Sequence, residues 1–129
     1  MLGDEEVRYG YLSQAHTDGD LYVVDALFET VGVRQLGKFG RGVGWGTSWD
    51  KPSFAVMTPH DGQAATVGNG TMVALVYREP AQVNAMHTKA LALGGNDEGA
   101  PGDRGGGFYG AYFRDLDGNK LCAFCMVKA

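Results

Sequence analysis

The two cysteines are the residues with the clearest potential for chemistry. They form the motif Cys122-Ala-Phe-Cys125, a spacing found in redox-active and zinc-binding sites. The residues around them are mostly apolar and fit a β-strand, in which side chains three positions apart point to opposite faces of the sheet. Such a strand cannot bring the two thiols together, and the sequence offers no second Cys-x-x-Cys motif or His pair to complete a zinc site. We therefore expect two buried, reduced thiols.

Three histidines could act as ligands, acids or bases: His16, His60 and His87. His87 lies within a predicted helix, where a partly buried position is the simpler interpretation, and His16 is predicted to lie in a loop. His60 falls in a segment between two predicted modules. It is a candidate for ligand contact because loops often carry function, although a solvated loop histidine is the alternative.

Serines and glycines give weaker indications of chemistry. None of the serines stands in the Gly-x-Ser-x-Gly setting of a hydrolase nucleophile. The glycines at positions 40, 42, 44 and 46 lack the spacing of a nucleotide-binding loop. They favour an edge strand or a glycine-rich hairpin whose backbone lies close to a neighbour. Arg104 precedes three glycines, and we interpret it as a solvated side chain of a loop, with contact to an anionic ligand as the alternative.

Composition restricts the class of protein. A chain of 129 residues with 44% hydrophobic and 20% charged residues forms one folded domain or a pair of small fused modules. A net charge of −4 argues against nucleic acid as a partner. The sequence has no apolar run of the roughly 20 residues needed to span a membrane, and its charged first residues do not resemble a signal peptide. We expect a cytoplasmic protein without a membrane partner.

A repeated order of elements must position these residues. Apolar spacing predicts helices over about 20–31 and 80–93, ended by Gly32 and by Gly94-Gly95. A strand is predicted before each helix, at 9–14 and 71–77, and β-rich segments follow at 33–57 and 96–126. The order strand, helix, three strands therefore occurs twice in a single domain. The first module covers about residues 8–58, the connection about 59–69, and the second module about 70–127.

Residues 107–122 carry the most specific pattern in the chain. They are predicted to form a β-hairpin with a tight turn at Asp117-Gly118-Asn119. The run resembles the C-terminal signature of the glyoxalase/bleomycin resistance protein/extradiol dioxygenase group, the vicinal oxygen chelate superfamily. In that group an aromatic strand is followed by Arg-Asp-Pro-Asp-Gly-Asn, an apolar residue and a metal-binding Glu. The segments 59–65 and 68–72 also resemble members of this group.

The resemblance implies an α+β fold in which two βαβββ modules form an eight-stranded, partly open barrel or cup, and it implies a homodimer. It also implies a divalent metal such as Mn, Fe, Ni or Zn, held by His and Glu side chains inside the cup. In this sequence those positions align with Tyr11 (or Tyr9), Met72 and Cys122. A phenol, a thioether and a lone thiol are poor ligands for such ions. We therefore expect a degenerate metal site and no cofactor.

Three functions are compatible with a protein of this fold and a degenerate metal site. The first is a metal-free protein that binds a small, flat, partly aromatic molecule. The second is a metal-dependent lyase, isomerase or dioxygenase of the same superfamily with other ligands, and the third is an interaction module whose sheet serves dimerisation. Aromatic residues on predicted cup strands also include Trp45 and Phe124, and they either line a pocket or fill the barrel. The candidate ligand-pocket residues are Tyr11, Met72, Cys122, Phe54, Tyr109, Tyr112 and His60.

Overall fold

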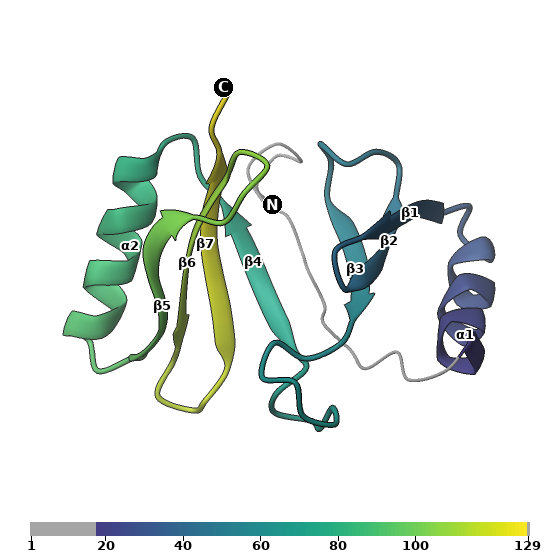
Figure 1. Cartoon of the computed structure of the whole chain (residues 1–129), viewed down its shortest axis with the longest axis horizontal. Coiled ribbons are helices and arrows are strands. Elements are labelled where there is room, and N and C mark those ends of the chain that lie inside the picture. The colour runs from purple at the N-terminus through teal and green to yellow at the C-terminus, as the bar shows by residue number, and fades with distance from the viewer. Residues whose placement is uncertain (1–17, 129) are drawn as a thin grey trace. The chain divides into compact units, whose positions relative to one another are not determined.

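The computed structural model describes residues 18–128, with side chains from residue 24 onward, as an α+β protein. The described residues form two compact units, and the second unit begins at Met72 (Figure 1). The predicted α+β class is confirmed. The predicted strand 9–14, which contains Tyr11, lies outside the described residues, as does His16.

The first unit consists of one helix and an antiparallel sheet. Helix α1 (Asp18–Glu29) precedes β1 (Arg34–Phe39), β2 (Gly42–Gly46) and β3 (Ser53–Met57), and the strands lie in the order β1-β2-β3. The helix lies about two residues earlier than its apolar spacing predicted. Gly32 follows it with a φ of 73°, a left-handed conformation that favours glycine at the end of a helix.

The glycines of β2 allow close packing in the middle of this sheet. A Cβ atom at Gly42 would come within 2.6 Å of Met57 Cβ, and one at Gly44 would come within 2.7 Å of the Trp49 ring. The prediction of a hairpin with a close backbone approach is confirmed. The alternative of an edge strand is wrong, because β2 pairs with both β1 and β3.

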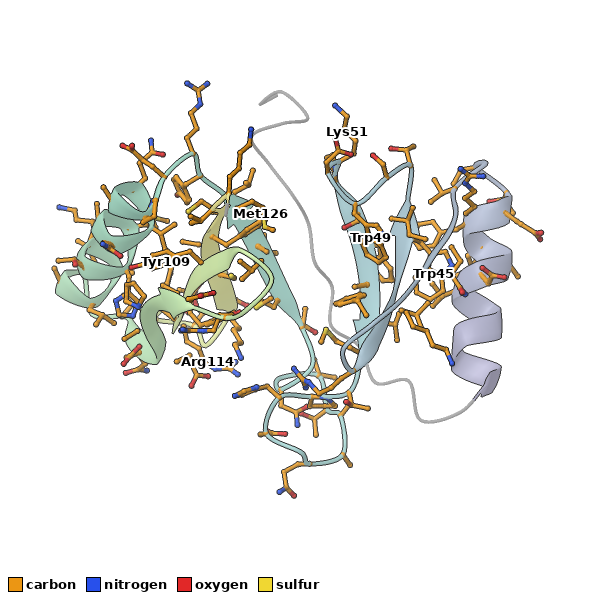
Figure 2. The ribbon with its side chains drawn as sticks, turned by 45° about the horizontal axis from the view of Figure 1, so that its top comes forward. Trp45, Trp49, Lys51, Tyr109, Arg114 and Met126 are labelled. Atoms are coloured by element: carbon orange, nitrogen blue, oxygen red, sulfur yellow. The ribbon has the colours of Figure 1, made fainter. Side chains whose placement is uncertain are left out.

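The core of the first unit is aromatic. Trp45 is fully buried and packs with Val43 and Val56, with Phe28 of α1 and Phe54 of β3 against them. The Trp45 ring nitrogen donates a hydrogen bond to Asp25 Oδ1 over 2.9 Å. Figure 2 shows Trp45 between the strands and α1. An indole needs such an acceptor when it is buried, so this bond fixes the ring against the helix.

The second unit contains the full predicted order of strand, helix and three strands. Strand β4 (Met72–Val76) is followed by α2 (Pro80–Ala92), β5 (Asn96–Asp103), β6 (Phe108–Arg114) and β7 (Lys120–Met126). The strand order is β4-β7-β6-β5, and β4 pairs with β7 in parallel while the other pairs are antiparallel. The chain between the parallel strands β4 and β7 runs through α2, β5 and β6. Parallel neighbours need such a long connection.

Helix α2 covers one face of this sheet (Figure 1). Its fully buried Val83 packs against Ala111, Ala123 and Cys125 from β6 and β7. Its start is well defined: Pro80 occupies the first turn, and the Gln82 side chain accepts the backbone N–H of the residue at position 79.

His87 of α2 is 6% exposed, so it is more deeply buried than predicted. Its Nε2 atom lies 2.9 Å from Asp97 Oδ1 at the start of β5. This contact ties the helix to the sheet and gives the buried imidazole a polar partner.

None of the helices within residues 18–128 is long and apolar enough to cross a bilayer.

The β6–β7 hairpin is closed by the side chain of Asp115. One of its carboxylate oxygens accepts the backbone N–H groups of Asp117 and Asn119, and the other accepts the Asn119 side-chain amide. The connection spans residues 115–119, slightly more than the predicted turn, and Gly118 adopts a φ of 87°. The Asn119 side chain, then its backbone N–H, lowers the pKa of Asp115 below the ordinary value of 3.8.

We predict that Asp115→Asn lowers the free energy of unfolding near neutral pH and has a smaller effect in acid. A carboxyl with a lowered folded-state pKa stabilises the protein above its unfolded pKa of 3.8 and loses that contribution as the pH falls through the folded value. Urea unfolding of wild type and variant at about pH 7 and about pH 3 measures the difference. Asp117→Asn removes the same charge from the same turn and serves as the control. Equal effects of Asp115→Asn at both pH values would contradict the prediction.

Candidate ligand-binding face

The face of the second sheet that points away from α2 brings together several of the predicted site residues. Alternation along β6 and β7 places Cys125, Ala111 and Ala123 toward the helix, and it places the neighbouring residues on the opposite side. We call this opposite side the aromatic face. It consists of Met72, Ala74, Val76, Phe108, Tyr112, Cys122 and Phe124.

Strand register sets the order of side chains on this face. Cys122 of β7 lies opposite Tyr112 of β6 and opposite Ala74 of β4. Two residues before Cys122 on β7, Lys120 lies opposite Met72. The rings of Phe108 and Phe124 stack at a centroid distance of 4.7 Å and an interplanar angle of 12°. The result is a layer of rings and sulfur atoms in which Cys122, Phe124 and Ala74 are buried, at 1%, 5% and 7% exposure. Tyr112, Met72 and Phe108 are half-buried.

Tyr112 and Cys122 form the polar pair of the aromatic face, and both are neutral at physiological pH. They are cross-strand partners on β6 and β7. Burial, and next the neighbouring Cys122, raise the pKa of Tyr112 to about 12. Burial also raises the pKa of Cys122 to about 12, against the opposing effects of the Tyr112 hydrogen bond and the nearby cations. The pair can donate and accept hydrogen bonds, but neither member supplies a negative charge.

Two cations flank this pair. The Arg104 guanidinium carbon and the Lys120 ammonium nitrogen each lie 5.5 Å from the centroid of the Tyr112 ring, within the range of a cation–π interaction. Lys120 belongs to β7, whereas Arg104 extends from the loop between β5 and β6. An Arg104 guanidinium nitrogen donates to the backbone carbonyl of Ala100. Arg104 is exposed, yet its head group has a defined position over the tyrosine.

Glycines in β5 leave the space that Arg104 occupies. A Cβ atom at Gly102 would lie 2.8 Å from Arg104 Nη1. One at Gly99 would lie 2.9 Å from Tyr112 Cδ2 and 3.4 Å from Arg104 Nη2. Larger residues at these two positions would push the guanidinium away from the ring.

The residues on this face do not fit the divalent metal that the aligned positions would hold in the superfamily. Met72 presents a thioether, and Cys122 presents a buried thiol that its raised pKa keeps protonated. Mn, Fe, Ni and Zn prefer imidazole, carboxylate or thiolate ligands. Among the described residues no group of three or more His, Cys, Asp or Glu side chains could hold a metal ion.

The other predicted site residues lie elsewhere. Tyr109 points to the α2 side of the sheet, where its hydroxyl donates to Asn84 Oδ1 over 2.7 Å (Figure 2). Phe54 belongs to the first unit and faces α1. His60 is an exposed loop residue of the first unit. Tyr11 lies outside the described residues. Of the predicted set, the structure therefore brings together Met72, Tyr112 and Cys122.

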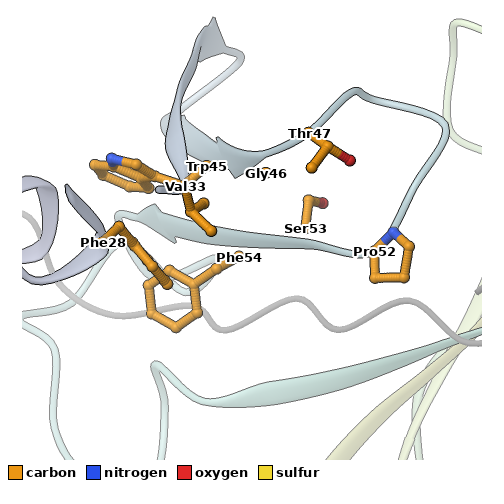
Figure 3. A pocket seen from close by; sticks show the side chains of 8 residues that line it. All are labelled: Phe28, Val33, Trp45, Gly46, Thr47, Pro52, Ser53 and Phe54. Carbon is orange, nitrogen blue, oxygen red and sulfur yellow. The ribbon is translucent and has the colours of Figure 1, made fainter. Parts of the chain in front are cut away.

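A hollow of about 390 Å³ lies in the first unit (Figure 3). The described residues that line it include no ionisable side chain. Its aromatic members also form the core between α1 and the sheet, with the Phe28 and Phe54 rings 5.2 Å apart. This arrangement is typical of loosely covered core residues rather than of a site with oriented polar groups. The lining residues are Phe28, Val33, Trp45, Gly46, Thr47, Pro52, Ser53 and Phe54.

The sequence-based set lacked Phe108, which belongs to the aromatic face, and Lys120, which lies beside it. Lys120 has the same strand parity as Cys122, so a count of alternating positions along β7 could have found it. Phe108 could have been found from Tyr112 in the same way. The position of Arg104 over Tyr112 depends on the path of a loop and has no comparable signal in the sequence.

The chain is 32% identical to a glyoxalase/bleomycin resistance protein from Albidiferax ferrireducens T118, over 91% of this chain and 96% of that protein, with a TM-score of 0.42. No protein-family model and no curated protein matches the chain.

Two longer proteins share the fold at low identity. The Mn(II)-bound glyoxalase from Novosphingobium aromaticivorans is 18% identical with a TM-score of 0.66, and the match covers 96% of this chain and 40% of that one. The 2,3-dioxygenase LapB from Pseudomonas sp. KL28 is 13% identical with a TM-score of 0.61, and the match covers 95% and 42% respectively. The chain thus spans about two fifths of the length of each.

We predict that neither thiol reacts quickly with Ellman's reagent in the native protein, and that both react once the protein is denatured. Cys122 and Cys125 are buried on opposite faces of β7 and are free, and burial raises the pKa of both. Absorbance at about pH 8 with and without denaturant measures the two counts. Cys122→Ala and Cys125→Ala assign any residual signal to one thiol. A fast native thiol, or a disulfide after mild oxidation, would contradict the structure.

Proposed function

Because the chain belongs to the glyoxalase/bleomycin resistance protein family of the vicinal oxygen chelate superfamily, we propose that it binds a small, flat, partly aromatic molecule on the aromatic face without a metal ion. The observation that carries this proposal is the placement of Met72, Tyr112 and Cys122 on one continuous surface with the stacked Phe108 and Phe124 rings. Rings and polarisable sulfur atoms contact flat apolar molecules favourably.

The polar groups of the face support recognition rather than metal chemistry. Cys122 is only 1% exposed and Tyr112 is half-buried, and both are neutral, so a bound ring would cover the exposed part of Tyr112 without burying a charge. Burying a neutral phenol costs much less than burying an unpaired carboxylate or imidazolium. The replacement of ionisable ligands by Met72 and Cys122 therefore favours occupation of this surface by an apolar ring.

We predict that flat aromatic molecules shift the backbone amide signals of residues 72–76, 108–114 and 120–126 in NMR spectra of the full chain. Neutral bicyclic aromatics such as 2-naphthamide are suitable probes. Tyr112→Leu should weaken their binding by roughly two- to tenfold, because it removes an aromatic contact worth about 0.5–1.5 kcal/mol.

Tyr109→Leu is the matched control for this experiment. It makes the same change three residues away on the same strand, but on the face that α2 covers. It should reduce stability and leave the affinity of the folded protein unchanged. Shifts confined to residues 24–57, or equal weakening by both variants, would contradict the proposed site.

We predict that the protein retains far less than one metal ion per chain after incubation with Mn, Fe, Ni or Zn and desalting. The aligned positions 72 and 122 offer a thioether and a protonated thiol, and neither competes with water for these ions. Mass spectrometry of the untagged protein measures the metal content. Met72→His with Cys122→Glu restores the superfamily ligand types at both positions and should increase retention. Near-stoichiometric metal in the unaltered protein would contradict the proposal and favour a metal-dependent enzyme.

A further inference from the structure

We propose that the ligand of the aromatic face carries a carboxylate, which Arg104 and Lys120 bind while the ring of the ligand lies on the sheet. This inference rests on the proposed function, because it specifies the chemical class of the molecule bound at the same site. It assigns to the two cations a role in selecting anionic over neutral aromatic ligands.

Among residues 24–128, both cations have donor groups that no carboxylate occupies. Within residues 24–128, neither Arg104 nor Lys120 lies within ion-pair distance of a carboxylate. Of the five guanidinium N–H groups, the Ala100 carbonyl accepts from one nitrogen. In that part of the chain the Lys120 ammonium has the Tyr112 ring as its polar contact and no hydrogen-bond acceptor. Hydrogen-bond donors for the oxygen atoms of a ligand are thus already assembled beside the Tyr112 ring.

Two neighbouring acidic groups make other contacts. The Glu98 carboxylate forms an ion pair with Arg114. The Asp103 carboxylate accepts the backbone N–H of Gly105 over 2.8 Å. Although the chain as a whole carries a net charge of −4, Arg104 and Lys120 both lie beside Tyr112. A carboxylate is the complementary group for this pair of cations.

The position of Arg104 is prepared before a ligand binds. Its hydrogen bond to the Ala100 carbonyl and its cation–π contact with the Tyr112 ring restrict the Arg104 side chain. An arginine without such contacts is among the most flexible side chains. The absence of side chains at Gly99 and Gly102 leaves the path over β5 open. A cation held in place loses less conformational entropy on binding, which favours its use in recognition.

Paired probes that differ only in charge test the inference. We would titrate the full chain with 2-naphthoate and with 2-naphthamide and follow the amide signals of residues 108–114 and 120–126. We expect 2-naphthoate to bind more tightly, and Arg104→Gln and Lys120→Gln each to weaken it by roughly two- to fivefold, as for a partly exposed ion pair. Binding of 2-naphthamide should change little in either variant. The preference should also shrink between about 0.05 and about 0.5 M NaCl.

Two further variants separate position from net charge. Lys89→Gln removes one positive charge at an exposed position of α2, in the same unit. It should leave the preference for 2-naphthoate intact. Gly102→Ala keeps every charge but places a Cβ atom against Arg104 Nη1, and it should reduce the preference by displacing the guanidinium.

The outcomes distinguish this inference from the proposed function. If neither probe shifts the signals of the aromatic face, the proposed function fails and the inference fails with it. If both probes bind there equally, the proposed function stands and the carboxylate preference is overturned. A preference for 2-naphthoate that survives both Arg104→Gln and Lys120→Gln, or that Lys89→Gln reduces equally, also overturns the inference.

Discussion

Alternation of side chains across the β6–β7 pair is the constraint on which the chemistry of this protein depends. Each strand has one face against α2 and one face free of it, so a shift of a single residue would exchange the two sets of side chains. Cys125 is thereby placed in the helix-covered core and Cys122 on the aromatic face. The same rule separates Tyr109 from Tyr112 on the neighbouring strand. The Asp115 turn fixes the register and thus determines which residues a ligand can meet.

The elements of the fold were largely predictable from the sequence, since local signals specify them. The spacing of apolar residues located both helices to within about two residues, and the segment around Gly118 located the hairpin turn. The separation of Cys122 from Cys125 followed from strand parity alone. For the described residues, the order of strand, helix and three strands in the second unit was also correct. These features depend on neighbours in sequence, which is the information that a single sequence contains.

The candidate site was predictable only in part, because it depends on which face each strand buries. Phe54 and Trp45 were expected on cup strands, yet they face α1. An amphipathic helix needs large apolar residues beneath it, and the rings of β2 and β3 meet that need, whereas Gly42 and Gly44 occupy the other parity. Tyr109 meets the same need beneath α2. Strand composition does not reveal which face a helix will cover, so aromatic residues of both parities looked equally suitable for a ligand.

The lack of ionisable ligand types at positions 72 and 122 and the presence of Arg104 and Lys120 beside Tyr112 have a common physical explanation. A charge in the centre of an apolar face must be desolvated when a ring covers it, whereas a charge at the end of a long side chain remains near water. Tyr112 and Cys122 occupy the centre and are neutral, since burial opposes ionisation of both. Arg104 and Lys120 reach the Tyr112 ring from a loop and from one end of β7. A surface of this kind can bind the apolar part of a molecule at its centre and an anionic group at its edge. Metal binding requires the reverse arrangement, with ionisable ligands at the centre, and Met72 and Cys122 do not provide it.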